Sequence, residues 1–310
     1  MRQKRSFSAY GTAIKWKRIF RNVLAGAVIL VLLSLIPLIY VKLKGQNGHE
    51  QRELRELYDS GAFETVYSQS SDLLKEKPLD PFLLTINGFS AYELAIAQIN
   101  SFDTISYVDS CIWSLRKTML FRENSSDGRV FYVLGKAYYY KGPGYADLAI
   151  NYLEKALAAA YKAADIPEYL GLAYAAIRDF RSSVAAFTLA LNGEGPSDIL
   201  LISIARSYLA LDEYESGRAY LIRCLETSKD FKVITAARLL LGEILFKTGD
   251  FEAAEAEYLQ VIEETGGDAE AYFQLGELYA SMGNTTRARS EWRRAIRLDP
   301  AHRLARSRLQ

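Results

Sequence analysis

Apolar residues near the end of the chain recur with the period of a helix and then give way to turn residues. Between residues 269 and 282, four positions share one face because they are spaced i, i+3, i+4 and i+7: Tyr272, Leu275, Gly276 and Tyr279. A second helix is expected after the Gly283-Asn284 break, with Ala288, Trp292 and Ala295 at i, i+4 and i+7. It should stop before Pro300, since proline cannot continue a helix.

The same short phrase returns along the chain: Leu-Gly, two further residues, and then Tyr or, in one copy, Leu. It begins at Leu134, Leu170, Leu241 and Leu275. Counting from Gly135, the matching small residues are Gly171, Ala205, Gly242 and Gly276, so the steps are 36, 34, 37 and 34 residues. A period near 34 residues is typical of helical hairpins stacked into a solenoid.

These residues resemble the tetratricopeptide repeat family. That family places an aromatic residue, Leu-Gly and Tyr in the first helix, then Ala, an aromatic residue and Ala in the second, then Pro. The copies beginning near residues 164, 235 and 269 fit this template. The copy around Ala205 is looser, with Gly217 where the family prefers Ala, and the copy around Gly135 has a turn lengthened by Gly142-Pro143-Gly144.

The resemblance implies an all-α fold, a right-handed superhelical solenoid of about seven helix-turn-helix repeats between residues 47 and 302. Residues 126–302 are expected to hold five repeats, and residues 47–125 two degenerate ones or a divergent helical cap. In the second degenerate copy, the second helix is expected at residues 104–120. Residues 303–310 are expected to form a basic tail or a partial capping helix.

A different signal lies at residues 22–41, which contain no charged residue. Twenty such residues are enough to span a bilayer, so this segment is expected to be a transmembrane signal anchor followed by a linker at 42–46. Residues 1–21 hold seven Lys or Arg and no acid, whereas only two basic residues follow the span closely. This asymmetry predicts a cytoplasmic N-terminus and a translocated repeat domain, most simply on the periplasmic side of a bacterial inner membrane.

Two other interpretations of residues 22–41 stay open. A cleaved signal peptide also begins basic and turns apolar, although this apolar run is longer than usual and Leu43-Lys44-Gly45 offers no small-x-small cleavage site. A buried core helix is the second alternative. No cysteine follows the span closely, so a lipid-anchored form is disfavoured.

Charge differs between the parts of the chain more than the net +1 suggests. Residues 1–49 hold nine Lys or Arg and no acid, so the remainder holds 29 basic against 37 acidic residues, the wrong sign for a nucleic-acid-binding solenoid. The C-terminal end is a basic patch of eight arginines: Arg287, Arg289, Arg293, Arg294, Arg297, Arg303, Arg306 and Arg308. They either bind a carboxylate, phosphate or anionic headgroup, or form a solvated helix partly neutralised by the nine acids of residues 248–285, and the second reading is favoured.

Residues for catalysis or metal binding are not arranged as sites. His49 and His302 lack partners at ligand spacing, and no phosphate loop or G-x-S-x-G elbow is present. Cys111 and Cys224 are expected to be buried small residues about three repeats apart, too far for a disulfide. We therefore expect no enzyme, no catalytic residues, no cofactor and no metal.

Without signals for catalysis, binding of a partner is the remaining class of function. The family resemblance implies a concave groove lined by the first helix of each repeat. The template positions correspond here to Arg129, Tyr132, Lys136, Tyr139, Tyr140, Glu168, Leu172, Ala175, Ala176, Ile202, Arg206, Leu209, Leu239, Glu243, Phe246, Lys247, Phe273 and Glu277. Such an aromatic, aliphatic and mixed-charge face suits an amphipathic or extended segment of a partner protein. Tyr139 and Tyr140 are the strongest candidates, although three consecutive tyrosines are also compatible with simple packing.

One subfamily is disfavoured by the same positions. Chaperone-binding members hold a terminal carboxylate with Lys, Asn and Arg, whereas the clamp positions here carry Tyr132, Val133, Glu168, Tyr169, Ile202 and Ser203. The leading hypothesis is a membrane-anchored scaffold for protein partners in bacterial envelope assembly, secretion or folding. The alternatives are an organelle-membrane receptor with a cytosolic groove, and a peptide- or small-molecule-binding component that feeds a transporter.

Overall fold

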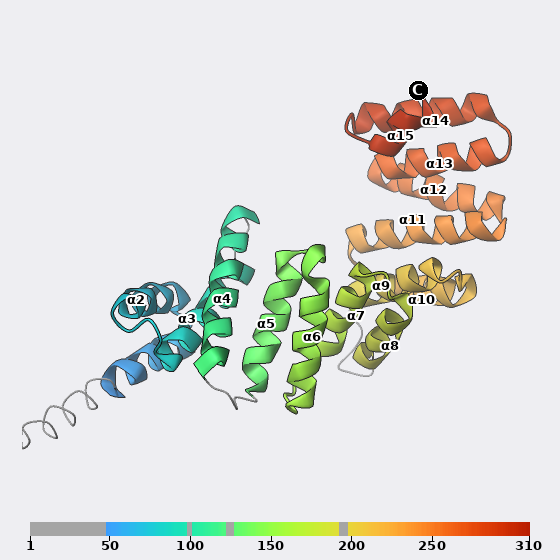
Figure 1. Ribbon diagram of the computed structural model, residues 1–310. Coiled ribbons are helices and arrows are strands. Elements are labelled where there is room, and N and C mark those ends of the chain that lie inside the picture. Colours follow the sequence, from blue (N-terminus) through green and yellow to red (C-terminus); the bar gives the residue numbers. More distant parts are fainter. Residues whose placement is uncertain (1–47, 98–100, 122–126, 192–197) are drawn as a thin grey trace, which may run out of the picture. The chain divides into compact units, whose positions relative to one another are not determined.

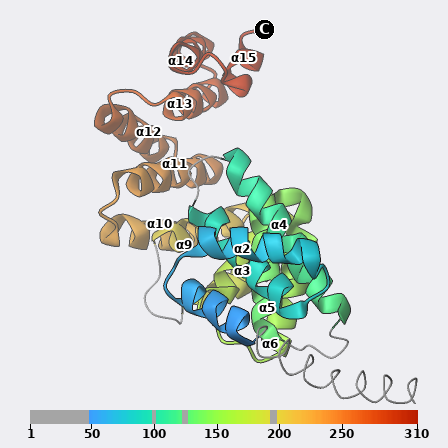
Figure 2. The ribbon, with the colours of Figure 1, turned by 90° about the vertical axis from the view of Figure 1, so that its left-hand side faces the viewer.

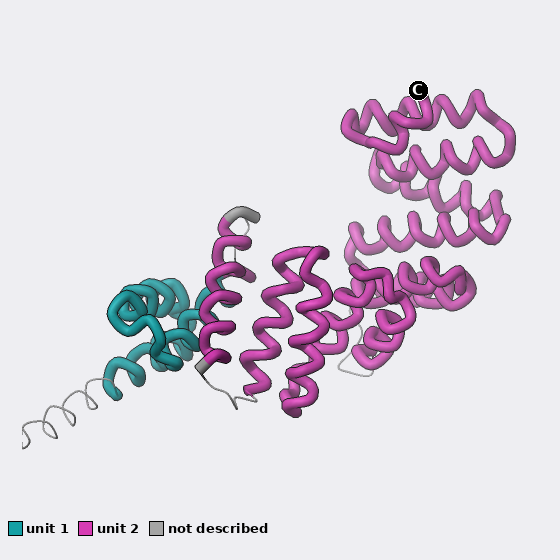
Figure 3. Tube along the Cα trace, in the orientation of Figure 1, with its two compact units in different colours: residues 1–94 teal, residues 95–310 magenta. Residues whose placement is uncertain are grey.

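The computed structural model describes residues 48–97, 101–121, 127–191 and 198–310, and within these ranges the regular elements are helices, with no strand. The chain divides into two compact units, residues 1–94 and 95–310 (Figure 3). No helix in the described ranges combines the length and apolarity needed to cross a membrane. The predicted span at residues 22–41 lies outside those ranges and stays a prediction.

The first unit contains the helix at residues 48–59, α2 (Phe63–Glu76) and most of α3 (Pro81–Ala97). The turn before α2 is made by Gly61, whose φ of +82° is a left-handed conformation that glycine adopts without strain. Six apolar side chains form the core of this unit: Leu54, Val66, Leu74, Leu83, Leu84 and Ile86. The buried Asn87 amide donates hydrogen bonds to the Ser70 and Ser71 hydroxyls, both at 2.9 Å, so its polar group is satisfied.

The second unit is a run of helical hairpins (Figures 1 and 2). Its helices are α4 (Ser101–Phe121), α5 (Gly128–Lys141), α6 (Ala146–Ala158), α7 (Ile166–Ala176), α8 (Phe180–Leu191), α9 (Asp198–Ala210), α10 (Tyr214–Thr227), α11 (Phe231–Thr248), α12 (Phe251–Thr265), α13 (Ala269–Ser281), α14 (Thr285–Leu298) and α15 (Arg303–Arg308). The 3-10 turn η1 (Pro143–Tyr145) occupies the lengthened turn expected after α5. Helix α4 begins three residues before the expected 104.

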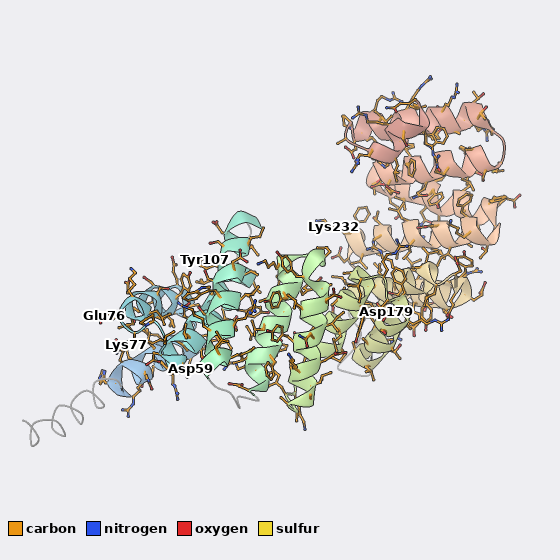
Figure 4. All side chains as sticks on the ribbon, viewed as in Figure 1. Asp59, Glu76, Lys77, Tyr107, Asp179 and Lys232 are labelled. Atoms are coloured by element: carbon orange, nitrogen blue, oxygen red, sulfur yellow. The ribbon has the colours of Figure 1, made fainter. Side chains whose placement is uncertain are left out.

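Two rows of helices follow from the way these elements pack. Each helix from α4 onward contacts the next one, and α5, α7, α9, α11 and α13 also contact one another in order. We call these alternate helices the inner row. Side chains fill the space between neighbouring helices (Figure 4). The unit is thus the all-α solenoid that the period predicts, while the handedness of its superhelix stays a prediction.

The repeated glycine is where the two helices of a hairpin touch. A Cβ added to Gly171, Gly242 or Gly276 would lie 2.4–2.5 Å from the ring of an aromatic residue on the second helix. Those rings belong to Phe187, Tyr258 and Trp292, sixteen residues further along in each case. The glycine is required because the ring occupies the space that any side chain would need.

The hairpin of α9 and α10 solves the same packing problem differently. Its first helix carries Ala205 and its second carries Leu221 at the counterpart position, both fully buried in one core cluster. The close approach moves to Gly217, where an added Cβ would lie 3.3 Å from the Ala205 carbonyl oxygen. Gly217 therefore allows α10 to approach the α9 backbone at Ala205 and the Ile244 side chain closely.

Candidate functional site

The helices of the inner row bring four of the expected groove residues to one open pocket, which we call the α9–α11 pocket. Arg206 and Leu209 come from α9, and Glu243 and Lys247 come from α11. The pocket has a volume of about 420 Å³ and is completed by Ala210, Asp212, Tyr214 and Leu240. Residues 34 to 41 positions apart in the sequence therefore meet because α9 and α11 are neighbours in the row.

Charges of both signs surround this pocket. Arg206 and Lys247 are exposed, whereas the Glu243 carboxylate is partly buried. Burial raises the pKa of Glu243, and Glu270 adds to that increase, while Lys247 and Arg206 oppose it. Leu209 and Leu240 supply apolar surface between the charges. The pocket can thus accept an apolar side chain flanked by charged or polar groups.

The rim of the pocket is fixed by a turn. Asp212 has a φ of +59°, and its carboxylate accepts a hydrogen bond of 2.6 Å from the Tyr214 hydroxyl. Asp and Asn tolerate the left-handed conformation better than most residues because their short side chains hydrogen-bond locally. The turn therefore holds the Tyr214 ring at the edge of the pocket.

A second group of expected residues lies on α5 and α7, and we call it the α5–α7 aromatic cluster. The Lys136 side chain is 11% exposed, and its Nζ donates to Asp165 Oδ2 at 2.7 Å and to the Tyr132 hydroxyl at 3.0 Å. The Tyr132 hydroxyl donates in turn to the Asp165 carboxylate at 2.9 Å. Nζ also lies 4.4 Å from the centre of the Tyr169 ring. Lys136 is engaged within the chain, so it contributes rigidity more than a free charge.

Tyr139 and Tyr140 extend this cluster toward solvent. Their rings are 5.4 Å apart, and the Tyr139 ring packs edge-on against Tyr169 at 5.1 Å. The hydroxyls of Tyr140 and Tyr169 lie 2.8 Å apart, and Tyr140 is 37% exposed. Burial raises the pKa of the nearby Glu168 carboxyl, with Asp165 adding to the increase. The cluster offers a pre-ordered aromatic surface with polar tips.

The cluster contains two residues that the sequence did not assign to the groove, Asp165 and Tyr169. Asp165 stands directly before α7, in the N-cap position, without capping that helix through its side chain. Its carboxylate instead accepts hydrogen bonds from Lys136 and Tyr132. An acid 29 residues after a first-helix Lys is a weak signal, because many surface acids lie at such separations.

Other expected groove residues lie inside the fold or at its edges. Ile202 and Phe273 are 7% and 5% exposed and belong to the core cluster of the C-terminal repeats. Leu172, Leu239 and Phe246 are partly buried against core side chains, so they offer only part of their surface. Arg129 is exposed at the start of α5, whereas Glu277 is held by Arg308 through contacts of 2.9 and 2.6 Å.

Residues suited to other chemistry form no constellation in the described ranges. No group of three or more His, Cys, Asp or Glu in those ranges is placed to hold a metal ion. Cys111 and Cys224 are buried free thiols, and burial raises the pKa of both. His302 caps α15 through Nδ1, which accepts from the Ala305 N–H, while its Nε2 lies 3.2 Å from Glu270.

Two sequence profiles of the tetratricopeptide repeat match the C-terminal repeats, one at residues 202–272 and one at 269–302. Residues 202–302 are tetratricopeptide repeats. A curated relative of this repeat protein, a CTR9 homolog from Arabidopsis thaliana, is 27% identical over 114 residues. That match covers 36% of this chain but only a tenth of the relative.

Solved structures share the fold of this repeat protein at low identity. The C-terminal part of a repeat protein from Cytophaga hutchinsonii aligns with a TM-score of 0.58 and 16% identity, covering 84% of this chain and 99% of its own. PilW, a type IV pilus biogenesis factor, aligns with a TM-score of 0.57 and 16% identity, covering 72% and 98%. PilF from Pseudomonas aeruginosa gives 0.52 and 14%, covering 71% and 95%. At these identities the likeness concerns the fold alone.

Proposed function

We propose that this tetratricopeptide repeat protein is a scaffold that holds segments of partner proteins on its inner row of helices. The observation that carries the proposal is the α9–α11 pocket, where Arg206, Leu209, Glu243 and Lys247 converge from two helices. Leu209 and Leu240 would receive an apolar side chain of the partner, and the surrounding charges would orient its backbone neighbours. In this proposal the chain positions proteins and catalyses no reaction.

The α5–α7 aromatic cluster would provide a second contact for the same segment. Its rings are already held by Lys136 and Asp165, so binding would cost little side-chain entropy. Tyr140 and Tyr169 would present their hydroxyls to the partner backbone. Two contacts on one inner row favour an extended or helical protein segment over a small molecule, because a small ligand would reach only one of them.

A photo-crosslinking experiment tests this proposal. A photoreactive amino acid at Ala210, which lines the pocket, is expected to capture discrete proteins, whereas the same amino acid at Leu259 on α12 is not. Both positions are exposed, so accessibility is matched. Capture at Ala210 should fall at least tenfold in the double variant Arg206→Glu/Lys247→Glu.

The matched control makes the same change in net charge on α10, a helix outside the inner row. Arg218 and Arg223 are exposed on α10, so Arg218→Glu/Arg223→Glu changes the net charge equally without touching the pocket. Capture that survives the pocket variant, or that falls equally in the control, would contradict binding at the α9–α11 pocket.

We further propose that residues 22–41 anchor the scaffold in a membrane and that the repeats face the periplasm, because the basic residues precede the span. The orientation is testable with Ser307→Cys, an exposed position on α15. Cys111 and Cys224 are fully buried, so a membrane-impermeant maleimide should report on residue 307 alone. Labelling only after the inner membrane is opened would place the repeats on the cytoplasmic side and favour the receptor alternative.

A further inference from the structure

The solvent-facing side of the last long helix is lined with arginine. On α14 the buried positions include Ala288, Trp292 and Ala295, which turn one face toward the core. Arg289, Arg293 and Arg297 recur every four residues on the exposed side. Four residues of helix rise about 6 Å, so the three guanidinium groups form a row about 12 Å long. We call these three residues the arginine row.

Arg303 and Arg306 add two more exposed guanidinium groups on α15. In residues 285–310 the acids are Glu291 and Asp299. Glu291 is 7% exposed and accepts from Arg294 at 3.1 Å, and Asp299 accepts from the backbone N–H of Ala301. Neither acid neutralises the arginine row.

The acidic stretch that precedes this patch does not neutralise it either. Two of its nine acids, Asp250 and Asp268, cap α12 and α13. Glu255 accepts from a tyrosine hydroxyl, Glu270 contacts His302 and Gln274, and both Glu257 and Glu264 face Arg238. Glu277 alone of the nine contacts an arginine of the patch, Arg308. Most of the acids have partners elsewhere, so they do not neutralise the arginine row.

A concave site adjoins the end of the row. Arg294, Arg297 and Leu298 of α14 line a pocket of about 310 Å³ together with Tyr272 and the Gly266-Gly267 turn. The Arg294 guanidinium carbon lies 5.7 Å from the centre of the Tyr272 ring. No acidic side chain lines this pocket. Arg294 Nη1 already donates to Glu291, so the pocket can receive one carboxylate between Arg297 and the remaining donors of Arg294, and guanidinium groups favour forked hydrogen bonds with carboxylates.

We propose that the arginine row and this pocket bind an acidic helical segment of a partner protein, at a surface separate from the α9–α11 pocket. Carboxylates spaced i, i+4 and i+8 on a partner helix repeat at the same interval of about 6 Å, so they match the row. One of them, or a terminal carboxylate, enters the pocket. A long nucleic acid would also meet residues outside the patch, and residues 50–284 hold 35 acids against 21 basic residues.

The test uses the full chain in a nonionic detergent and a 16-residue alanine-based peptide with Glu at positions 4, 8 and 12. The peptide is expected to bind more weakly by at least tenfold when the row is changed to Arg289→Gln/Arg293→Gln/Arg297→Gln. A control removes three exposed arginines from α8 and α10, Arg181→Gln/Arg218→Gln/Arg223→Gln, and should change the affinity less than twofold. Binding is measured by fluorescence anisotropy at low and high salt, and unchanged circular dichroism verifies that both variants fold.

Three other probes separate the partner classes. They are a peptide of the same composition with its three Glu residues adjacent, a 20-nucleotide single-stranded DNA, and soluble short-chain phosphatidylglycerol. The proposal expects each of them to bind at least fivefold more weakly than the spaced peptide. It is overturned if the spaced peptide fails to bind the wild-type chain at low salt or binds the row variant equally well. Preference for DNA or lipid, lost in the row variant, would overturn the assignment to a protein partner.

Discussion

The contact between Gly242 and Tyr258 yields a quantitative prediction about stability. In Gly242→Ala the new Cβ would lie 2.5 Å from Tyr258 Cε1 and 2.9 Å from Cδ1, against an ordinary contact of 3.4–4 Å. The ring is fully buried, so it has no solvent to move into. Overpacking of this kind costs about 3 kcal/mol at the upper end of its range, and the better helix propensity of Ala returns about 1 kcal/mol. We therefore expect the free energy of unfolding to fall by about 2 kcal/mol.

The control for this substitution is Gly144→Ala. A Cβ at Gly144 would meet nothing within 4 Å, and Gly144 does not have a left-handed φ. Its stability should stay the same or rise by up to about 1 kcal/mol, because Ala restricts the unfolded chain. Urea unfolding followed by circular dichroism measures both changes. Hydrogen exchange should localise the loss to α11, α12 and their neighbours, since repeats couple mainly to adjacent ones.

The reasoning would be refuted if Gly242→Ala were neutral, or if Gly144→Ala cost as much. A companion substitution tests the cause. Replacing Tyr258 with Leu copies the pairing of Ala205 with Leu221 in the hairpin of α9 and α10. The double variant Gly242→Ala/Tyr258→Leu should therefore be more stable than the sum of its single variants by about 1 kcal/mol or more.

Three other predictions concern polar groups. Burial and a hydrogen bond to Glu255 raise the pKa of Tyr279 to about 12, so wild type should lose stability relative to Tyr279→Phe as pH rises from 10 through 12, while below pH 10 wild type should be more stable by about 1 kcal/mol. Burial raises the pKa of Glu243, so Glu243→Gln should stabilise the fold at pH 7, and this gain should disappear below the unfolded pKa of about 4.3; a gain independent of pH would contradict it. A double-mutant cycle of Lys136→Met and Asp165→Asn should give a favourable coupling of about 1 kcal/mol by urea unfolding, and additive effects would show that the ion pair is inert.

Much of the helical order of the second unit is predictable from sequence because the hairpins contain residues that start or stop helices. Pro300 follows the end of α14, and Asp250 and Asp268 are capping residues at the starts of α12 and α13. Gly283 has a positive φ in the turn where a break is expected, and Gly249 has a positive φ at the end of α11. Local signals of this kind depend on a few neighbouring residues, so the sequence reveals them.

The candidate sites are less predictable because they depend on which neighbouring side chain forms an ion pair with each charged residue. Glu277 is predicted to line the groove and Arg308 to belong to the basic C-terminal patch, yet the two side chains form an ion pair with each other. Ile202 and Phe273 fit the groove template but are buried, since a helix of the inner row also packs sideways against the next one. The sequence pattern does not reveal the role of Asp165, because its partner Lys136 lies 29 residues away. These outcomes require three-dimensional pairing that spacing alone does not specify.

The exchange at Ala205, Gly217 and Leu221 has a consequence for engineering this solenoid. The hairpin packs Ala205 against a smaller partner, Leu221, where other hairpins pair Gly with an aromatic ring, so the packing depends on the combination of residues at the crossing. Installing the consensus Gly at 205 alone would open a void, and installing Ala at 217 alone would press on the Ala205 carbonyl oxygen. A variant that brings this repeat to the family consensus therefore has to change residues 205, 217 and 221 together.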